Sequence, residues 1–319
     1  MQLLPLYIFL NSASGRLECG VIKVTIYNVG SINIDHLYRV EKFPEPGETL
    51  LAKDSMTNMG GKGLNISVAL SRSGADVRHV GLIGAEDADT RAMIRELGLK
   101  DDLIFGSNAR TGHAIIYLDN RSENCIVILG GANQSFSDGV IGDALHGARE
   151  GDWLVLQNET NANHMAIKAA RDKKLKIALV AAPYDAQTMP EQISRVDLVS
   201  MNETETERFE ADIGKSIREL EGPEFLITYG KNGAMFHSNS EQYFVDAYEV
   251  DALDTTGAGD TFFGVFLAHY ANGVSADKAL NYASSAAALM VQRKGAATVI
   301  PSASEIEAFY HSAANSPDC

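Results

Sequence analysis

The sequence predicts an α/β fold with a central, mainly parallel sheet flanked by helices. Short runs of β-branched and apolar residues alternate with helical segments along most of the chain, which is the pattern of strands joined by crossover helices. The 319 residues, 45% of them hydrophobic, are enough to bury one large core, and no linker divides them. One pair of strand-like segments is joined by a short polar turn instead, which predicts an antiparallel hairpin added to the parallel sheet.

The first elements of the chain are predicted to be strands. Val21 to Val29 is rich in β-branched residues and ends at a glycine, which is typical of a buried strand. Thr49–Met56 is a second candidate strand. Thr111–Leu118 and Asn124–Leu129, joined by the turn Asp119–Ser122, form the predicted hairpin. An edge of the main sheet is the alternative place for this hairpin.

The second half of the chain carries the regular alternation. Strand-like runs at Lys176–Val180, Val196–Ser200 and Phe225–Thr228 alternate with helical runs around Met165–Asp172 and Lys215–Leu220. This alternation predicts a parallel sheet that is covered by helices on both faces. Trp153 comes directly before the strand Leu154–Leu156 and is expected in the core.

The most informative segment is Asp254–Thr261, which leads into an apolar run of helical spacing. Gly257, Ala258 and Gly259 are small and bring backbone N–H groups together at the start of the predicted helix. A helix N-terminus has unpaired N–H donors and partial positive charge, so it can hold a phosphate and keep a first-turn aspartate ionised. Asp260 is therefore a candidate general base, although an aspartate that only caps the helix fits the same residues.

A second polar constellation lies far upstream. Asn33 and Asp35 follow the first predicted strand, at the carboxyl end where open parallel sheets bind ligands. An Asn/Asp pair offers mixed donors and acceptors, which suit sugar hydroxyls. Gly60 and Gly61 allow the backbone to approach a ligand, and Asn65 follows on a predicted helix. A turn asparagine and a tight glycine bend are the alternative interpretation, which weakens when the two segments are considered together.

With these segments, the chain resembles the ribokinase branch of the PfkB family of carbohydrate and nucleoside kinases. Gly60–Asn65 corresponds to the first signature of the family and Asp254–Thr261 to the second, in the expected order and separation. The resemblance implies one ribokinase-like kinase domain over residues 21–319, after an N-terminal extension, 1–20, outside the core. It also implies a small β lid near residues 35–58 and 111–130 that covers the sugar and often supplies a homodimer contact.

The resemblance also assigns ligands to residues. The implied sugar site contains Asn33, Asp35, Gly60, Gly61, Lys62, Asn65, Glu159 and Asp260. The implied nucleotide site contains Asn202, Thr228, Gly230, Gly233 and Gly259, and Asn202 and Glu205 would organise Mg²⁺ through water. Ribokinases also bind K⁺ beside the glycine turn, and the corresponding positions are Asp254, Thr256, Met290, Arg293 and Gly295. Where ribokinases usually offer a serine hydroxyl at the end of this loop, this chain has Val299, with Thr298 adjacent.

The implied reaction is in-line transfer of the ATP γ-phosphoryl group to the primary hydroxyl of a free sugar. Asp260 would accept the hydroxyl proton. The backbone N–H groups of Gly257, Ala258 and Gly259 would stabilise the transferred charge, assisted by magnesium.

The substrate is expected to be a free pentose. Asn33 with Asp35 and Glu159 favours it, because a carboxylate near the distal end of the sugar would repel a phosphate already there. D-ribose, giving the 5-phosphate, is the first choice. A nucleoside or another free sugar is the alternative, and a catalytically silent sugar-binding regulatory protein on the same fold is a third.

Composition limits the other partners. A net charge of −15 disfavours a nucleic acid, and no apolar run approaches the ~20 residues that span a bilayer. Leu3–Leu10 is the only candidate targeting segment, and the three cysteines are too scattered for a disulfide framework, so the reduced cytoplasm is the expected compartment. The histidines show no metal-ligand spacing, although His113 lies in the predicted lid, where it could face the sugar.

Overall fold

The computed structural model describes residues 9–10, 17–18, 24–121 and 123–314. Most of the predicted N-terminal extension and the start of the strand predicted at Val21–Val29 lie outside the described residues. Within the extension, Phe9–Leu10 (β1) pairs antiparallel with Leu17–Glu18 (β2). None of the helices in the described ranges is long and apolar enough to cross a membrane.

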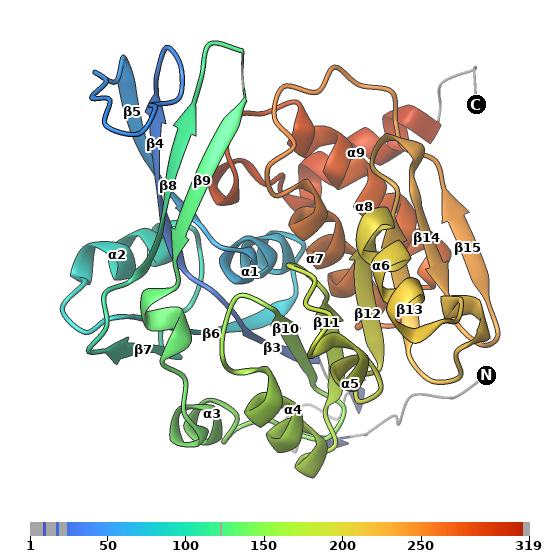
Figure 1. Ribbon diagram of the computed structural model, residues 1–319. Coiled ribbons are helices and arrows are strands. Elements are labelled where there is room, and N and C mark those ends of the chain that lie inside the picture. Colours follow the sequence, from blue (N-terminus) through green and yellow to red (C-terminus); the bar gives the residue numbers. More distant parts are fainter. Residues whose placement is uncertain (1–8, 11–16, 19–23, 122, 315–319) are drawn as a thin grey trace.

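A nine-stranded sheet forms the centre of the fold (Figure 1). Its strands are Thr25–Val29 (β3), Asp76–Gly84 (β6), Ile104–Ser107 (β7), Trp153–Gln157 (β10), Lys176–Val180 (β11), Leu198–Asn202 (β12), Glu224–Thr228 (β13), Ala234–His237 (β14) and Gln242–Val245 (β15). They lie in the order β15-β14-β13-β12-β11-β10-β3-β6-β7. All pairs from β13 to β7 are parallel, whereas β14 and β15 are added antiparallel. The predicted mainly parallel sheet is confirmed.

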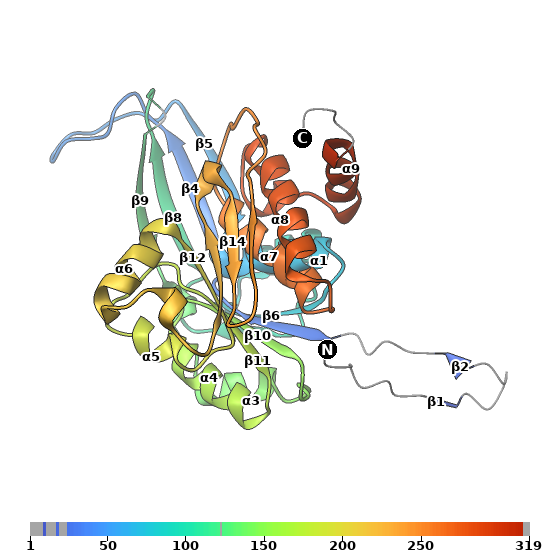
Figure 2. The ribbon, with the colours of Figure 1, turned by 90° about the vertical axis from the view of Figure 1, so that its right-hand side faces the viewer.

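Helices cover both faces of this sheet, as predicted (Figure 2). One face packs against Lys62–Arg72 (α1), Ala88–Glu96 (α2), Ala258–Tyr270 (α7), Ala276–Val291 (α8) and Ala303–Ala314 (α9). The other face packs against Asp138–Ala144 (α3), Asn163–Asp172 (α4), Met189–Ile193 (α5) and Glu203–Ile213 (α6). Both coverings are needed because the strands of a parallel sheet are apolar on both sides. Trp153 is buried, as expected.

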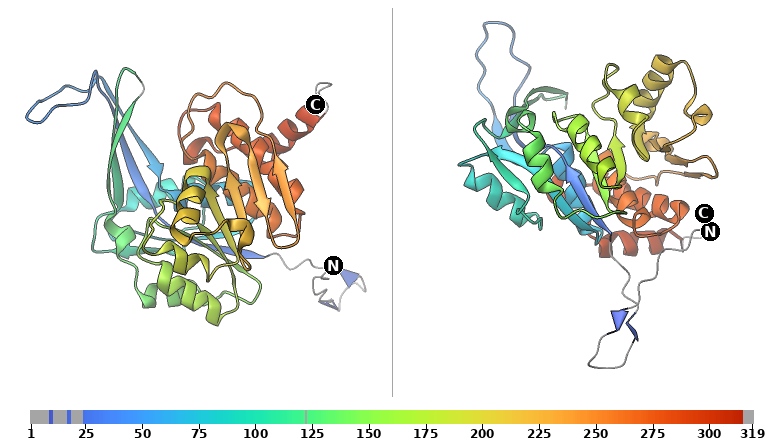
Figure 3. Two further views of the ribbon diagram at one scale, coloured as in Figure 1. Left: turned by 45° about the vertical axis from the view of Figure 1, so that its right-hand side comes forward. Right: turned by 90° about the horizontal axis from the view of Figure 1, so that it is seen from below.

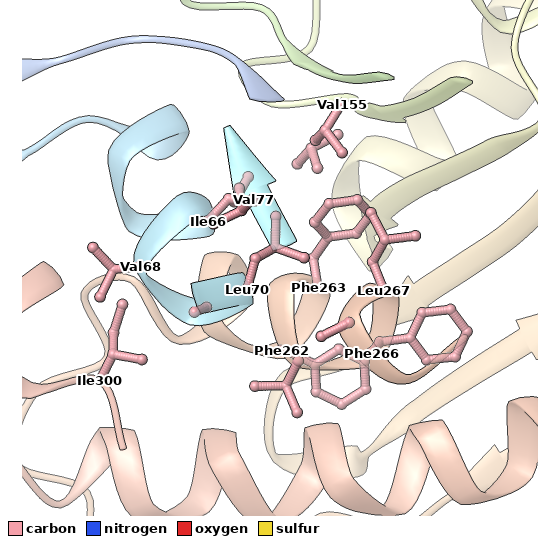
Figure 4. Packing of buried hydrophobic residues seen from close by; sticks show 14 of the residues in the cluster. Ile66, Val68, Leu70, Val77, Val155, Phe262, Phe263, Phe266, Leu267 and Ile300 are labelled. Carbon is pink, nitrogen blue, oxygen red and sulfur yellow. The ribbon is translucent and has the colours of Figure 1, made fainter. Parts of the chain in front are cut away.

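The first turns of α1 and α7 are brought together by a shared apolar core (Figure 4). Phe262 and Phe263 of α7 are buried with Ile66 and Leu70 of α1, and burial of each such side chain contributes ~1.5–3 kcal/mol. The helices approach closely at Gly264, where a Cβ would lie 2.5 Å from the Cβ of Ala69. The two sequence motifs therefore meet in space because their helices pack against each other.

A second sheet forms the predicted lid. Its strands are Asn33–Arg39 (β4), Asp54–Gly60 (β5), Gly112–Leu118 (β8) and Asn124–Leu129 (β9), in the order β5-β4-β8-β9. The lid projects from the body of the molecule beside α1 and α2 (Figures 1 and 3). The predicted hairpin is confirmed as β8 and β9, which pair antiparallel. Its alternative place, an edge of the main sheet, is wrong because the lid strands pair only among themselves in the described residues.

Two elements predicted from local sequence are wrong in position or type. The strand expected at Thr49–Met56 runs instead over Asp54–Gly60, because its register is set by antiparallel pairing with β4 and places Gly60 opposite Asn33. The helical run expected at Lys215–Leu220 is a single 3₁₀ turn, Ile217–Glu219. Gly214 adopts a left-handed conformation with φ of 67° and ends α6, so the chain has to start a new turn after it.

Candidate active site

Asp260 lies in the first turn of α7, which begins after Gly257 in the left-handed conformation (φ 72°). Its carboxylate is buried, and Asn65 Nδ2 of α1 donates to Asp260 Oδ2 at 2.8 Å. The other carboxylate oxygen, Oδ1, lies 3.8 Å from Lys62 Nζ. A Cβ added at Gly259 would meet nothing within 4 Å, so space is open beside the first turn of α7. Ala258 N–H donates to the Thr255 carbonyl at 3.2 Å.

Lys62 is the cation that faces this carboxylate. The negative charge of Asp260 raises the pKa of the Lys62 ammonium, burial lowers it, and Glu159 and Glu205 raise it further. Lys62 is therefore charged at neutral pH, because an ordinary lysine pKa is already about 10.4 and the net shift is upward. The two sequence motifs, Gly60–Asn65 and Asp254–Thr261, thus contribute an opposite-charge pair to one site.

Glu159 ties the end of β3 to the glycine loop before α1. Its Oε2 accepts the Ser31 hydroxyl at 2.5 Å and the Lys62 backbone N–H at 3.0 Å. Ser31 Oγ in turn accepts the Gly63 N–H at 3.2 Å. Gly61 has a positive φ of 94°, and a Cβ there would lie 2.9 Å from the Ser31 carbonyl oxygen, so the loop requires glycine at this point. Ser31 was not predicted as a site residue from the sequence.

Asn33 is fixed by a partner that the sequence motifs also did not reveal. Asn133, in the 3₁₀ turn Gly131–Gln134, donates to Asn33 Oδ1 at 2.8 Å and pairs with both backbone groups of Ile32. The contact requires Gly112 on β8, because a Cβ there would lie 2.5 Å from Asn33 Oδ1. The Gly-Ala-Asn turn that contains Asn133 could have been recognised only as a turn.

Asp35 is the carboxylate on β4 of the lid that was predicted to bind the sugar. A Cβ at Gly60 would lie 2.0 Å from Asp35 Oδ2, so this glycine leaves room for the carboxylate. Burial, and after it the charge of Glu159, raise the pKa of Asp35 to about 6. The structure therefore brings Asp35 close enough to Glu159 for the charge of Glu159 to disfavour ionisation of Asp35.

A cavity of about 280 Å³ opens beside the start of α7. It brings together Thr228, Gly230, Gly233 and Gly259, four of the residues assigned to the nucleotide, but Asn202 is not part of its lining. The rest of its wall is mainly small or apolar and comes from the loop before Gly257 and from α8, for example Val250, Ala252, Ala287, Ala288 and Val291. Such a wall suits a flat aromatic base and offers few polar partners for it.

Asn202 and Glu205 cap the N-terminus of α6. Asn202 Oδ1 accepts the Glu205 N–H, and Glu205 Oε2 accepts the Asn202 N–H, each at 2.8 Å. Burial raises the pKa of Glu205, while the Lys62 charge lowers it and the Asp260 charge raises it. Glu205 therefore lies within electrostatic reach of Asp260, although the described residues contain no group of three histidine, cysteine or acidic side chains that could hold a metal ion directly.

The loop assigned to K⁺ is braced by hydrogen bonds. Asp254 Oδ1 accepts the Thr256 N–H at 2.9 Å, and Asp254 Oδ2 accepts the Gly295 N–H at 3.0 Å. The Met290 carbonyl accepts the Arg293 N–H at 3.0 Å. A Cβ at Gly295 would lie 3.7 Å from both Thr298 Oγ1 and Val299 Cγ1, so a hydroxyl and a methyl group border the same point.

His113 does not face the sugar end. It pairs with Ile34 on β4, one residue out of step with Asp35, so the two side chains project from opposite faces of the lid. His113 lines a separate hollow of about 780 Å³, together with His36 and the Gly84–Asp87 segment. This hollow is larger than the one beside α7, but it contains none of the predicted site residues. The possible sugar-facing role of His113 is therefore wrong.

Residues 25–303 match the family described as pfkB family carbohydrate kinase. The chain belongs to this family. A ribokinase from Haemophilus influenzae is 32% identical to this PfkB kinase over 298 residues, which cover 89% of this chain and 97% of that protein. A ribokinase from Arabidopsis thaliana is 32% identical over 297 residues, which cover 86% of this chain and 77% of that protein.

Solved structures show the same fold. A ribokinase from Thermotoga maritima has a TM-score of 0.80 and 28% identity, and the match covers 91% of this PfkB kinase and 100% of that chain. The Arabidopsis thaliana ribokinase complexed with ribose and ATP has a TM-score of 0.76 and 28% identity, covering 90% of this chain and 98% of that one. The ribokinase-like fold predicted from the two motifs is confirmed.

Proposed function

We propose that this PfkB kinase transfers the γ-phosphoryl group of ATP to the primary hydroxyl of free D-ribose, giving ribose 5-phosphate. The observation that carries the proposal is the buried Asp260 carboxylate at the open N-terminus of α7, held by Asn65 at 2.8 Å and faced by Lys62 at 3.8 Å. The similarity to ribokinases over most of the chain supports ribose as the acceptor.

Asp260 acts as the general base. Its Oδ2 is occupied by Asn65, so Oδ1 accepts the hydroxyl proton as the sugar oxygen bonds to the γ-phosphorus. The bond between that phosphorus and the β,γ-bridging oxygen breaks, and ADP leaves with the electron pair. The Lys62 ammonium and the N–H groups of Gly257 and Gly259 stabilise the charge on the transferred group, whereas the Ala258 N–H is already donated to the Thr255 carbonyl.

The sugar lies between the lid and the start of α1. Asn33, Asp35 and Glu159 recognise its hydroxyls, with the backbone of Gly60 and Gly61 close beside it. The negative charges of Asp35 and Glu159, which interact with each other, would repel a sugar that already carries a phosphate. A free sugar is therefore the preferred acceptor.

ATP occupies the 280 Å³ cavity, with its base against the small residues of α8 and its phosphates toward Gly259. Mg²⁺ neutralises phosphate charge when it is bound with ATP. Asn202 and Glu205 would hold its water ligands, because both are polar groups at the carboxyl end of β12 and Glu205 interacts electrostatically with Asp260 and Lys62. A cytoplasmic site of action agrees with the need for ATP and with scattered cysteines that form no disulfide framework.

The test is ADP release with Mg·ATP across free pentoses, hexoses, nucleosides and sugar phosphates. We expect ribose to give the highest kcat/KM, with the product phosphorylated on its primary hydroxyl. Preference for a nucleoside would preserve the chemistry and overturn the sugar assignment. Nucleoside kinases from Methanocaldococcus jannaschii and Burkholderia thailandensis share the fold at 20% and 21% identity, which makes this the necessary comparison. Ribose binding without turnover on any acceptor would indicate a silent regulatory protein.

We also propose a monovalent-cation site beside the α7 turn. Asp254 and the backbone at Thr256, Met290, Arg293 and Gly295 surround it. Thr298 would supply the side-chain hydroxyl that Val299 lacks, because both border Gly295 at the same distance. A carboxylate oxygen that accepts one hydrogen bond retains a further lone pair, so Asp254 remains able to bind K⁺.

The lid is proposed to form a homodimer contact. β9 is an edge strand of the lid, and its apolar side chains Ile126, Val127, Ile128 and Leu129 are about half exposed or more. An apolar edge strand favours pairing with another chain. Sedimentation or light scattering should give a dimer for the natural chain, and Ile128→Glu should give a monomer, because a charge would then be desolvated in the contact. A monomeric natural chain would contradict this assignment.

A further inference from the structure

Four polar side chains are buried directly beneath the glycine loop and the first turn of α1. Asn28 on β3, Ser67 on α1, His79 on β6 and Gln157 on β10 are each at most 1% exposed. Gln157 Nε2 donates to Asn28 Oδ1 at 2.8 Å, and Asn28 Nδ2 donates to Ser67 Oγ at 2.8 Å. Ser67 Oγ also pairs with His79 Nδ1 at 2.8 Å. We call these residues the buried polar chain.

The buried polar chain interrupts an otherwise apolar face of the large sheet. Nearer the amino ends of the same strands, this face carries Ile26, Val77 and Val155, which belong to the apolar core shared with α1. Figure 4 shows Val77 and Val155 in this core. Two residues further along each strand, where the next side chain projects from the same face, the residues are Asn28, His79 and Gln157. The change from apolar to polar therefore occurs at the carboxyl ends of β3 and β10 and midway along β6.

One contact links the buried polar chain to the site. The second proton of Asn28 Nδ2 is donated to the carbonyl of Gly63 at 2.7 Å, between Lys62 and Asn65 in the first turn of α1. Gly63 is pressed against the end of β3, because a Cβ there would lie 2.4 Å from the Ser31 backbone nitrogen. Small shifts of this turn would move the Lys62 ammonium and the Asn65 amide, both of which face Asp260.

Gln157 donates to Asn28, and Asn28 donates to Ser67. Burial lowers the pKa of His79 to about 3, so the ring is neutral, and its Nδ1 shares the remaining hydrogen bond with the Ser67 hydroxyl. The two ends, Gln157 Oε1 and His79 Nε2, have no hydrogen-bond partner in the described part of the chain. Such unpaired buried groups destabilise the fold, whereas apolar side chains of similar shape would not. A stabilising role therefore does not account for the buried polar chain.

We propose that the buried polar chain is a positioning device that fixes the first turn of α1, and with it Lys62 and Asn65, relative to Asp260. The side chains act through the Gly63 carbonyl and touch neither substrate. Asn28, His79 and Gln157 lie on three neighbouring strands of the large sheet, so the sheet itself, and not only the surrounding loop, fixes the position of the turn. This inference deepens the proposed sugar-kinase function and rests on it for its kinetic readout.

Three variants separate positioning from stability. Asn28→Val breaks the chain at its centre and removes the bond to Gly63. A fourfold variant, Asn28→Val with Ser67→Ala, His79→Phe and Gln157→Met, replaces every member by an apolar side chain, so no orphaned partner remains among the four. Ile26→Ala is the matched control, because it opens a cavity on the same strand and face without touching a polar contact.

We expect Asn28→Val to lower Tm and to raise the sugar KM about tenfold, the factor that corresponds to ~1.4 kcal/mol, with the ATP KM unchanged. The fourfold variant should recover Tm relative to Asn28→Val but keep the raised sugar KM. Ile26→Ala should lower Tm and leave the sugar KM as it is. Amide hydrogen exchange at residues 62–65 should accelerate in the first two variants and not in the control.

A sugar KM that returns to the natural value in the fourfold variant, or exchange at residues 62–65 that matches the control, would overturn the proposal. If the fourfold variant does not fold, Asn28→Val against Ile26→Ala decides by the same two measurements. The exchange measurement needs no substrate, so it distinguishes a failure of this inference from a failure of the proposed function. In the latter case the natural chain would not phosphorylate ribose, yet the exchange pattern would stand.

Discussion

The proposed sugar end and the proposed nucleotide end of the site are built by different means. At the sugar end, side chains hold one another: Glu159 binds the Ser31 hydroxyl and the Lys62 N–H, and Asn133 holds Asn33. At the nucleotide end, glycines and small apolar side chains shape a cavity of about 280 Å³. The difference implies that removing a polar group should damage sugar recognition, whereas added bulk should damage ATP binding.

Asp260, the proposed general base, lies where the two ends of the site meet, so its loss should have the largest effect on activity. Asp260→Asn removes the proton acceptor but keeps the shape and the contact with Asn65. We expect kcat to fall by ~10²–10⁴, with a much smaller change in the sugar KM. Steady-state kinetics with ribose and Mg·ATP measure both. Asp251→Asn, an exposed carboxylate a few residues earlier, should behave like the natural enzyme.

Near-full turnover of Asp260→Asn would reduce Asp260 to a helix cap. The sugar end and the nucleotide end would then have no identified catalytic residue between them. A loss of kcat equal in Asp251→Asn would instead indicate a general effect of charge near the turn. The two outcomes are separated by the control alone.

The sugar end should respond next most strongly. Glu159→Gln places an amide where two donors, the Ser31 hydroxyl and the Lys62 N–H, converge on one oxygen. We expect the sugar KM to rise by about tenfold to a hundredfold with a smaller change in kcat, since a charged hydrogen-bond partner is lost. Ser31→Ala should raise it by less, because Lys62 N–H still reaches the carboxylate. An unchanged sugar KM in both variants would place the sugar elsewhere.

The nucleotide end should show the opposite pattern. Ala287 lines the cavity from α8, and Ala287→Leu adds bulk to its wall. We expect the ATP KM to rise about tenfold and the sugar KM to stay constant, because the substitution removes space and no polar contact. Separate titrations of ATP and ribose give the two values. A parallel rise in both KM values would show that the two ends are not independent.

The parts predicted from the sequence follow the same division. The motifs around Gly60 and Asp260 have recognisable residue types at fixed spacing. The alternation of strand-like and helical runs predicts the parallel sheet that brings these motifs together. Ser31 and Asn133 were missed because their role arises from contacts across 128 and 100 residues of chain, which no local pattern encodes. Asn28 and His79 were missed for the same reason, since a buried polar residue has no sequence signature of its own.

The wrong boundaries also have physical causes. β5 begins later than β-propensity suggested because pairing with β4 sets its register, and tertiary pairing outweighs local preference in strands. His113 was placed on the wrong face because face assignment depends on the register between β4 and β8. Lys215–Leu220 has helical composition, but Gly214 interrupts it. Local sequence thus predicted which elements exist better than where they begin or point.

Asp35 should give a smaller effect with a distinctive pH dependence. Its pKa is raised to about 6 in the folded chain, first by burial and then by Glu159, so its ionised form opposes folding. The neutral form contributes its full stabilisation below the ordinary aspartate pKa of about 4, and this contribution is lost as the pH rises through about 6. Asp35→Asn should therefore unfold with a free energy roughly 1–2 kcal/mol higher than the natural chain at pH 8, allowing for its partial exposure.

The difference in unfolding free energy should vanish near pH 4, and denaturant titrations at pH 4, 6 and 8 measure it. In the same variant the ribose KM should rise several-fold at pH 8, because a carboxylate acceptor is replaced by an amide. The natural enzyme should bind ribose more tightly as pH rises through about 6, whereas Asp35→Asn should not. Equal pH dependence in the two proteins would show that Asp35 does not titrate at the sugar end.

The smallest expected effect concerns the loop at Asp254, which lies before the start of α7. Asp254 already braces the turn through the Thr256 and Gly295 N–H groups, so the loop is partly ordered without a cation. We expect K⁺ to raise kcat about twofold to fivefold over Na⁺ at equal ionic strength, a range that corresponds to about 0.4–1 kcal/mol. Thr298→Val should abolish this activation, because it removes the hydroxyl beside Val299, while activity in Na⁺ is retained. A flat response of the natural chain to K⁺ would mean that the hydrogen bonds of Asp254 alone order the turn, and the start of α7 would then need no cation to hold the phosphates.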